Sequence, residues 1–214
     1  MNDKELERLD SMLAYEREAK ASGFDVIAGL DEAGRGPLAG PVVSAAVILP
    51  EKYYPEGLDD SKKLTPKTRE RLYALLIKDS VAWAVGLSDS IEIDEINILQ
   101  ATKVSMERAL SALTPKPDYL LIDALKLNDV GIRQKAIVKG DSLSLSIAAA
   151  SVLAKVTRDK LMLIYDRQYP GYGFARHKGY GTAEHINKIN ELGMCPIHRA
   201  SFRHGDKKYV QIKF

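Results

Sequence analysis

Cysteine is almost absent from the sequence, since Cys195 is the only one among 214 residues. A single thiol cannot form an internal disulfide, which excludes a disulfide-stabilised secreted scaffold and fits a reducing compartment. The chain also lacks any apolar run of the roughly 20 residues that a membrane span needs. Its first residues, MNDKELERLD, have no apolar core of the kind found in signal peptides. We therefore expect a soluble, cytoplasmic protein.

A large excess of charge of one sign is lacking too, with 31 Lys and Arg against 29 Asp and Glu. Hydrophobic residues make up 45% and charged residues 28%, which are the proportions of a folded globular protein. The charge is nevertheless uneven, because residues 155–214 hold twelve Lys and Arg, five Asp and Glu, and all four histidines. This asymmetry indicates a polyanionic partner bound by the C-terminal part, although a solvated basic tail accounts for it equally well.

The apolar pattern predicts an α/β fold. Helices are expected at residues 5–19, 66–78, 96–113, 141–166 and 183–192, and strands at 26–31, 42–49, 81–87, 119–123 and 134–138. The first two strands are joined by a short glycine-rich turn and should pair antiparallel, because a parallel partner needs a long crossover. Later strands alternate with helices, so we expect a mixed sheet flanked by helices. The glycines and aromatics of residues 169–181 argue against regular structure there.

Four acidic residues stand at the ends of these elements. Asp31 and Glu32 end one apolar strand, Asp123 ends another, and Asp141 begins a helix. If the strands of Asp31 and Asp123 are parallel neighbours, both carboxylates emerge at one edge of the sheet. Such a cluster is unfavourable by itself, and a divalent cation removes the conflict. Oxygen ligands without any Cys or His spacing suit Mg²⁺ or Mn²⁺ rather than zinc.

Each of these residues also has a purely structural interpretation. Asp141 is a good helix N-cap, and capping alone is a common reason for such an aspartate. Asp31 and Asp123 could simply end strands, and Glu32 could be an exposed turn residue. The joint pattern is much less expected by accident, but the apolar pattern alone does not decide between the two interpretations.

Gly34, Arg35 and Gly36 follow the acidic pair immediately. Glycines there let a ligand approach the backbone, whose N–H or C=O can bind a sugar hydroxyl while Arg35 binds a phosphate. An ordinary glycine turn with a surface arginine is the alternative.

Six longer segments are more specific. They are GLDEAGRGPLAGPVV (29–43), DDSKKLT (59–65), LIDALKL (121–127), KGDSLSLSIAAASVLAKVTRD (139–159), GYGFARHKGYGTAEH (171–185) and PIHRASF (196–202). In this order they resemble the signature segments of the prokaryotic type 2 ribonucleases H, the ribonuclease HII class. The resemblance covers most of the chain from Val26 to Phe202. One departure is Ala200, where many members have a second arginine.

The resemblance implies a ribonuclease H-like mixed sheet flanked by helices, with a helical extension at the C-terminal end. We expect one domain over residues 1–214, with an N-terminal helix at about 3–21, a catalytic core at about 24–166 and a basic extension at about 167–214. The implied activity is endonucleolytic hydrolysis of RNA in RNA–DNA hybrids and incision 5′ to single ribonucleotides embedded in duplex DNA. Products would carry 5′-phosphate and 3′-hydroxyl ends, and the enzyme is expected to be a monomer.

Matched motif by motif, the resemblance assigns catalytic and metal-binding roles to Asp31, Glu32, Asp123 and Asp141. The cofactor would be Mn²⁺ or Mg²⁺, in a two-metal mechanism. Substrate binding is assigned to Gly34, Arg35, Gly36, Lys62 and Tyr180. In this interpretation the Gly-Arg-Gly turn and Tyr180 recognise the ribose 2′-hydroxyl, and Lys62 contacts a phosphate.

Further sequence-independent phosphate contacts are expected from basic residues of the C-terminal part, namely Lys155, Arg158, Arg176, Lys178, Arg199 and Arg203. We expect His198 to have a hydrogen-bonding role and Cys195 to be a buried, passive thiol. The last residues, YVQIKF, superficially resemble a sliding-clamp tail peptide, but a frayed or packed terminus is the preferred interpretation.

Two other functions stay open. A type 3-like hybrid nuclease would ignore isolated ribonucleotides, although Arg35, Asp141 and the short N-terminal segment favour type 2. A hybrid-binding module without catalysis is the second alternative, against which the presence of all four carboxylates argues.

Overall fold

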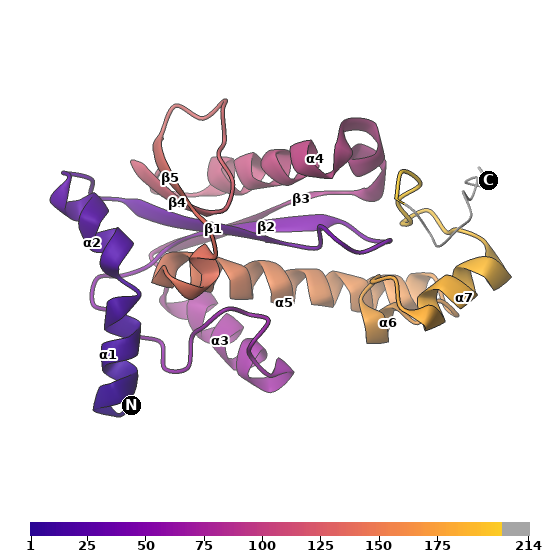
Figure 1. The fold of residues 1–214 in the computed structure, drawn as a ribbon, viewed down its shortest axis with the longest axis horizontal. Helices are drawn as coiled ribbons and strands as arrows, with labels where there is room; N and C mark the ends of the chain where they lie inside the picture. Colours follow the sequence, from indigo (N-terminus) through magenta and orange to yellow (C-terminus); the bar gives the residue numbers. More distant parts are fainter. Residues whose placement is uncertain (203–214) are drawn as a thin grey trace.

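The computed structural model describes residues 1–202. Its centre is a five-stranded sheet with the order β3–β2–β1–β4–β5 (Figure 1). The strands are β1 (Ile27–Ala33), β2 (Val42–Ile48), β3 (Ala82–Ser88), β4 (Tyr119–Asp123) and β5 (Arg133–Ile137). Because β1 pairs antiparallel with β2 and parallel with β4, the sheet is mixed, as expected.

Helices cover both faces of the sheet. They are α1 (Asp3–Ser11), α2 (Ala14–Ala21), α3 (Pro66–Asp79), α4 (Ser90–Ala112), α5 (Leu145–Gln168), α6 (Phe174–His177) and α7 (Ala183–Leu192), with a 3₁₀ turn η1 (Gly140–Ser142) before α5. In Figure 1, α5 runs along one face and continues beyond the sheet to α6 and α7, while α4 lies on the other face. No helix within residues 1–202 is both long and apolar enough to cross a membrane.

Strand β2 shows why this sheet is stable between two layers. All seven of its residues are buried. Ala45 and Val47 pack with apolar side chains of α1, α3 and α5, whereas Ala46 and Ile48 pack with those of α4. Successive side chains of a strand point to opposite faces, so an uninterrupted apolar run fits a strand covered on both sides.

The expected N-terminal helix over residues 5–19 is wrong, because the chain forms two helices there. The break falls at Met12 and Leu13. The carbonyl oxygen of Met12 accepts a hydrogen bond from the N–H of Leu145 at 2.9 Å. The Met12 carbonyl therefore binds the first residue of α5 instead of an N–H group of its own helix. The apolar periodicity of residues 5–19 cannot predict this tertiary hydrogen bond.

Helix α4 begins at Ser90, six residues before the expected start at Ile96. Asn97 interrupts it with φ 67° and ψ 162°. The side-chain oxygen of Asn97 accepts hydrogen bonds from the N–H groups of Leu99 and Gln100 at 3.0 and 3.2 Å. Asn97 thus caps a second helical segment, and the apolar pattern detected only that segment.

The start of α5 and the segment 169–181 also differ from expectation. Ser144, not Asp141, is the N-cap of α5, and its hydroxyl accepts from the N–H of Ile147. Asp141 lies in the preceding turn η1. Within residues 169–181, which were expected to be irregular, α6 forms one helical turn between Gly173 and Lys178, both with left-handed backbone.

Gly29 on β1 lies against the backbone of α5, and this contact generates a prediction. A Cβ at residue 29 would lie 2.2 Å from the carbonyl carbon of Ser146. Gly29→Ala should therefore lower the free energy of unfolding by about 1–3 kcal/mol, because α5 must move away from the sheet. Gly131→Ala is the matched control, since that Cβ meets nothing within 4 Å. Urea unfolding of both variants measures the difference, and equal stability would contradict the close packing of β1 on α5.

Candidate active site

Two aspartates lie near the ends of adjacent parallel strands: Asp123 ends β4, whereas β1 continues for two residues beyond Asp31, so the expected strand end at Asp31 is wrong. Leu30 on β1 lies opposite Ile122 on β4, and the next residues along the two strands are Asp31 and Asp123. Asp31 is buried, with 3% of its surface exposed, while Asp123 is partly exposed. The expected meeting of two strand-end carboxylates at one edge of the sheet is found.

Asp141 joins this edge through the 3₁₀ turn. The N–H of Gly140 donates a hydrogen bond to Oδ1 of Asp123 at 2.7 Å, which fixes η1 against the end of β4. Asp141 follows directly and is 5% exposed. Because Ser144 caps α5, capping does not explain this buried aspartate.

Burial and mutual repulsion act on the carboxylates together. Burial, followed by repulsion from Glu32 and Asp123, raises the pKa of Asp31 well above its ordinary value. Burial likewise raises the pKa of Glu32, against the opposing effect of Arg35. It also raises the pKa of Asp123, although the N–H of Gly140 acts in the other direction. A cluster that keeps its negative charge here needs nearby cations.

Lys62 supplies one positive charge at this cluster. Its Nζ lies 3.2 Å from Oδ2 of Asp141 and 3.9 Å from Oδ1 of Asp60. The Lys62 side chain is 75% exposed, so its ammonium group is also open to solvent and to a substrate. Asp60 is a further carboxylate near the site that the sequence interpretation omitted. Its position two residues before Lys62 in the sequence could have indicated that it lies near the site.

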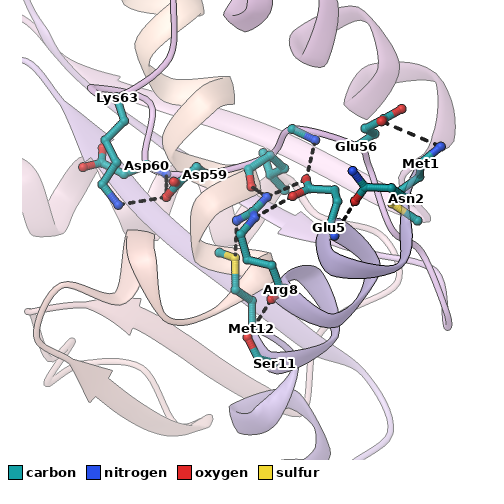
Figure 2. A network of polar contacts seen from close by, with 12 residues as sticks. Met1, Asn2, Glu5, Arg8, Ser11, Met12, Glu56, Asp59, Asp60 and Lys63 are labelled. Atoms are coloured by element: carbon teal, nitrogen blue, oxygen red, sulfur yellow. Dashed lines mark hydrogen bonds and ion pairs between the residues drawn. The ribbon is translucent and has the colours of Figure 1, made fainter.

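Helix α1 anchors the loop after Glu56, and Figure 2 shows the polar network of Glu5 and Arg8 beside this loop. Arg8 donates to both carboxylate oxygens of Glu5 and to the carbonyl oxygen of Leu58, the latter at 2.7 Å. Oε1 of Glu5 accepts a hydrogen bond from the N–H of Gly57 at 2.9 Å. The first helix therefore fixes the chain a few residues before Lys62.

The donor chemistry of the cluster fits a divalent cation. All four predicted ligands are carboxylates, and Oε2 of Glu32 is buried without a hydrogen-bond partner within residues 1–202. Hard oxygen donors of this kind suit Mg²⁺ or Mn²⁺. Over the same residues, however, no three Asp, Glu, His or Cys side chains are arranged to hold one ion as they stand. The residues therefore match the expected ligand type, while the side-chain positions do not form a complete ion site.

The Gly34–Arg35–Gly36 turn leaves β1 beside this cluster. Gly34 is buried with φ 99°, in the left-handed region that favours glycine, while Arg35 and Gly36 are exposed. Nη1 of Arg35 lies 3.5 Å from Oε1 of Glu32. The turn thus presents an exposed backbone and a cationic side chain next to the carboxylates.

Tyr180 reaches this turn from a segment far along the chain. Its side chain is exposed, and a Cβ at Gly36 would lie 3.9 Å from its Cε1. The two segments are joined where the N–H of Leu38 donates to the carbonyl oxygen of Gly179 at 2.8 Å. The structure therefore brings together two of the predicted substrate-binding elements that are more than 140 residues apart.

A groove of about 470 Å³ extends from Tyr180 between α3 and α5. Its basic lining residues are Arg69, Lys155, Lys160, Arg176 and Lys178. Three of the predicted phosphate contacts, Lys155, Arg176 and Lys178, thus lie on one continuous surface. A larger cavity of about 590 Å³, between α2 and the opposite ends of β1 and β2, contains none of the predicted site residues.

The prediction of phosphate contacts by Arg158 and Arg199 is wrong. Both side chains are buried, with 1% and 0% of their surface exposed. They donate to backbone carbonyl oxygens, including those of Pro41 and Gly40 at 3.0 Å, and cannot reach a phosphate. The sequence alone does not distinguish a basic side chain that faces solvent from one that is buried. Arg203 and the YVQIKF segment lie outside the described residues.

His198 and Cys195 have the expected structural roles. Both are buried, and the N–H of Cys195 donates to Nδ1 of His198 at 2.9 Å. Nε2 of His198 lies 3.0 Å from Nε2 of His185. Burial raises the pKa of the Cys195 thiol to about 11, so it stays protonated and unreactive at neutral pH.

Known proteins of one family are similar to this chain in sequence. The sequence pattern of the family described as Ribonuclease HII matches residues 28–205. A protein named Ribonuclease HII from Acetivibrio thermocellus is 58% identical over 94% of this chain and 78% of its own length. Another from Geotalea uraniireducens is 56% identical over 96% of this chain and 94% of its own length.

Solved structures show the same architecture. The crystal structure of ribonuclease H2 from Pyrococcus horikoshii OT3 has a TM-score of 0.68 at 30% identity, over 84% of this chain and 95% of that chain. RNase HII of Archaeoglobus fulgidus, solved in a complex with PCNA, has a TM-score of 0.70 at 23% identity, over 89% and 98%. Bst-RNase HIII, solved in complex with Mn²⁺, has 0.58 at 21% identity, over 88% and 65%. The expected ribonuclease H-like fold is confirmed.

The raised pKa of Asp31 predicts how stability depends on pH. A carboxyl group whose pKa is higher in the folded than in the unfolded state stabilises the fold while protonated, and that stability is lost as pH rises through the folded pKa. In EDTA, Asp31→Asn should therefore increase the free energy of unfolding at pH 7. The gain should shrink as pH falls through the raised pKa of Asp31 toward its unfolded value.

Asp25→Asn is the control, because Asp25 is exposed at the other end of β1. Urea unfolding from pH 4 to pH 8 should show no comparable pH-dependent gain for it. A stability difference between Asp31→Asn and the unmodified protein that does not change with pH would show that Asp31 is not electrostatically destabilised.

Proposed function

This chain belongs to the ribonuclease HII family and is a hydrolytic nuclease of the ribonuclease H type, and we propose that it acts on two kinds of substrate. It hydrolyses RNA within RNA–DNA hybrids, and it incises 5′ to a single ribonucleotide embedded in duplex DNA. The observation that carries the second activity is the approach of Gly36 to Tyr180, beside the carboxylate cluster. Products carry 5′-phosphate and 3′-hydroxyl ends.

We assign the cofactor site to Asp31, Glu32, Asp123 and Asp141, with Mn²⁺ or Mg²⁺ as the ion. The all-carboxylate donor set and the unpartnered buried oxygen of Glu32 support this within the described residues. A pair of divalent cations would supply Lewis-acid stabilisation of the scissile phosphate and a water of lowered pKa. The four carboxylates would hold these ions, and burial of Asp31 keeps bulk water from one side of the site.

Recognition of the ribose falls to the Gly34–Arg35–Gly36 turn and Tyr180. The 2′-hydroxyl distinguishes RNA from DNA at a given position, and an exposed backbone without a side chain at Gly36 lets a sugar approach closely. The Tyr180 hydroxyl donates to the same 2′-oxygen, and its ring stacks on the following deoxyribose. Because water is the nucleophile, the 2′-hydroxyl is needed for recognition only.

Phosphate binding extends along the groove beyond Tyr180. Lys62, with its exposed ammonium group beside Asp141, contacts a phosphate near the scissile bond. Lys155, Arg176 and Lys178 contact the backbone further along, which makes binding strongly dependent on salt. We infer a cytoplasmic monomer of one domain, in which the basic extension that begins at about residue 167 contributes Arg176 and Lys178 to this surface.

A cleavage assay with two substrates tests the proposal directly. In Mg²⁺ or Mn²⁺ the enzyme should cut both a continuous RNA–DNA hybrid and a DNA duplex with one ribonucleotide, and EDTA should abolish both activities. Asp31→Asn should lower kcat by at least about 1,000-fold while hybrid binding persists. Asp25→Asn, at the opposite end of β1, should leave both activities unchanged.

The two alternatives give different results in this assay. A type 3-like nuclease would cut the hybrid and leave the single ribonucleotide intact. A binding module without catalysis would bind both duplexes and cut neither at any metal concentration.

Tyr180→Phe tests the role of the tyrosine hydroxyl. The variant keeps the ring and loses one hydrogen bond, so cleavage at a single ribonucleotide should fall about tenfold, which corresponds to about 1.4 kcal/mol. Cleavage of a continuous hybrid should fall less. Tyr165→Phe on α5 is the control and should change neither rate; equal losses on both substrates in Tyr180→Phe would refute the assignment.

A further inference from the structure

Two buried arginines carry positive charge into the interior of the protein, behind the Gly34–Arg35–Gly36 turn and the segment of Tyr180. Arg158 comes from α5, and Arg199 follows the short segment after α7. Their residues are 1% and 0% exposed. Burial of two neighbouring cations costs free energy unless their N–H groups are fully used, so their hydrogen-bond partners indicate what they do.

Arg158 connects two loops through three carbonyl oxygens. Its Nε donates to Pro41 at 3.0 Å, its Nη2 to Ala39 at 3.1 Å and its Nη1 to Lys178 at 3.0 Å. The first two acceptors belong to the loop between β1 and β2. The third lies two residues before Tyr180, so one guanidinium group ties the Gly-Arg-Gly loop to the tyrosine segment.

Arg199 holds the same loop nearer to the site. Its Nη2 donates to the carbonyl oxygen of Gly34 at 2.6 Å and its Nη1 to that of Arg35 at 2.9 Å. Nε and Nη2 also donate to the carbonyl oxygen of Gly40, at 3.0 and 2.7 Å. Two of the three residues in the proposed ribose-reading turn therefore have their carbonyl groups fixed by one side chain.

Two glycines of this region leave room for side chains of α5, namely Arg158 and Met162. A Cβ at Gly34 would lie 2.1 Å from Nε of Arg158, and one at Gly40 would lie 2.4 Å from Sδ of Met162. Both have positive φ, at 99° and 85°. A loop with such glycines is flexible by itself, so its fixed shape depends on the arginines that pack against it.

On the basis of the proposed function, we propose that Arg158 and Arg199 are positioning residues that set selectivity for a single embedded ribonucleotide. They fix the backbone of residues 34–36 relative to Tyr180, so that both elements meet one 2′-hydroxyl. A continuous hybrid has a ribose at every nucleotide of its RNA strand, so a turn that has become mobile can still contact a 2′-hydroxyl. An isolated ribonucleotide offers one productive register, and it therefore requires the fixed geometry.

Lysine at either position tests this role, because it keeps the charge but lacks the planar fork that serves several carbonyl groups. For Arg158→Lys and Arg199→Lys, kcat at a single ribonucleotide should fall at least about tenfold more than kcat on a continuous hybrid. KM should change little, since the exposed phosphate contacts are intact. Arg108→Lys is the control for the loss of a hydrogen bond from arginine to a backbone carbonyl, because the half-exposed Arg108 donates to the carbonyl oxygen of Leu87, away from the site.

Hydrogen exchange provides a second measurement. In the unmodified protein the amides of Leu38 and Gly40 should be strongly protected, and Arg158→Lys should lose this protection without a change at α4. Free exchange of these amides in the unmodified protein would overturn the proposal. So would an unchanged ratio of the two activities in a lysine variant whose loop has become mobile.

The experiment separates this proposal from the proposed function. If the unmodified enzyme does not cut at a single ribonucleotide, the proposed function fails on that result alone. If it does cut and the lysine variants keep their preference, only the positioning role of the two arginines fails.

Discussion

Parallel pairing of β1 with β4 is the constraint on which the site depends. It places Asp31 beside Asp123 in spite of the repulsion between their carboxylates, because the apolar residues before them set the register of the two strands. The buried α5 face then raises the pKa of Asp31, and repulsion from its neighbours adds to this effect. The core thus gains its stability from packing and holds in place a carboxylate cluster that would not assemble by itself.

Nearby groups reduce the repulsion without removing the charge. The N–H of Gly140 serves Asp123, the ammonium of Lys62 lies near Asp141, and the guanidinium of Arg35 lies near Glu32. Both cationic side chains are partly exposed, so a polyanionic substrate can draw them from carboxylate to phosphate. The two cationic side chains that lie near the cluster in the free protein are therefore the ones to which the proposed function gives binding roles.

Much of this was predictable from sequence, and the failures share one cause. Strands follow from local apolar runs, so the end of β4 at Asp123 was predicted, whereas β1 continues two residues beyond Asp31. Asp141 was mistaken for a possible helix cap because η1, three residues long, leaves no periodic signal. The break at Met12 depends on a hydrogen bond from Leu145, a contact more than 130 residues away in the chain. Local patterns cannot report such tertiary contacts.

The buried arginines extend this argument from fold to specificity. In sequence, Arg158 and Arg176 are equivalent basic residues, yet one is buried among carbonyl groups and the other lines an exposed groove. A charge in the interior cannot add affinity for a phosphate, and its desolvation opposes folding. The proposed positioning role gives a reason for this cost, because a buried arginine fixes the backbone of the turn that recognises a single ribose hydroxyl. In the proposed function the sheet places the carboxylates, whereas Arg158 from α5 and Arg199 from the segment after α7 fix the backbone of the Gly34–Arg35–Gly36 turn.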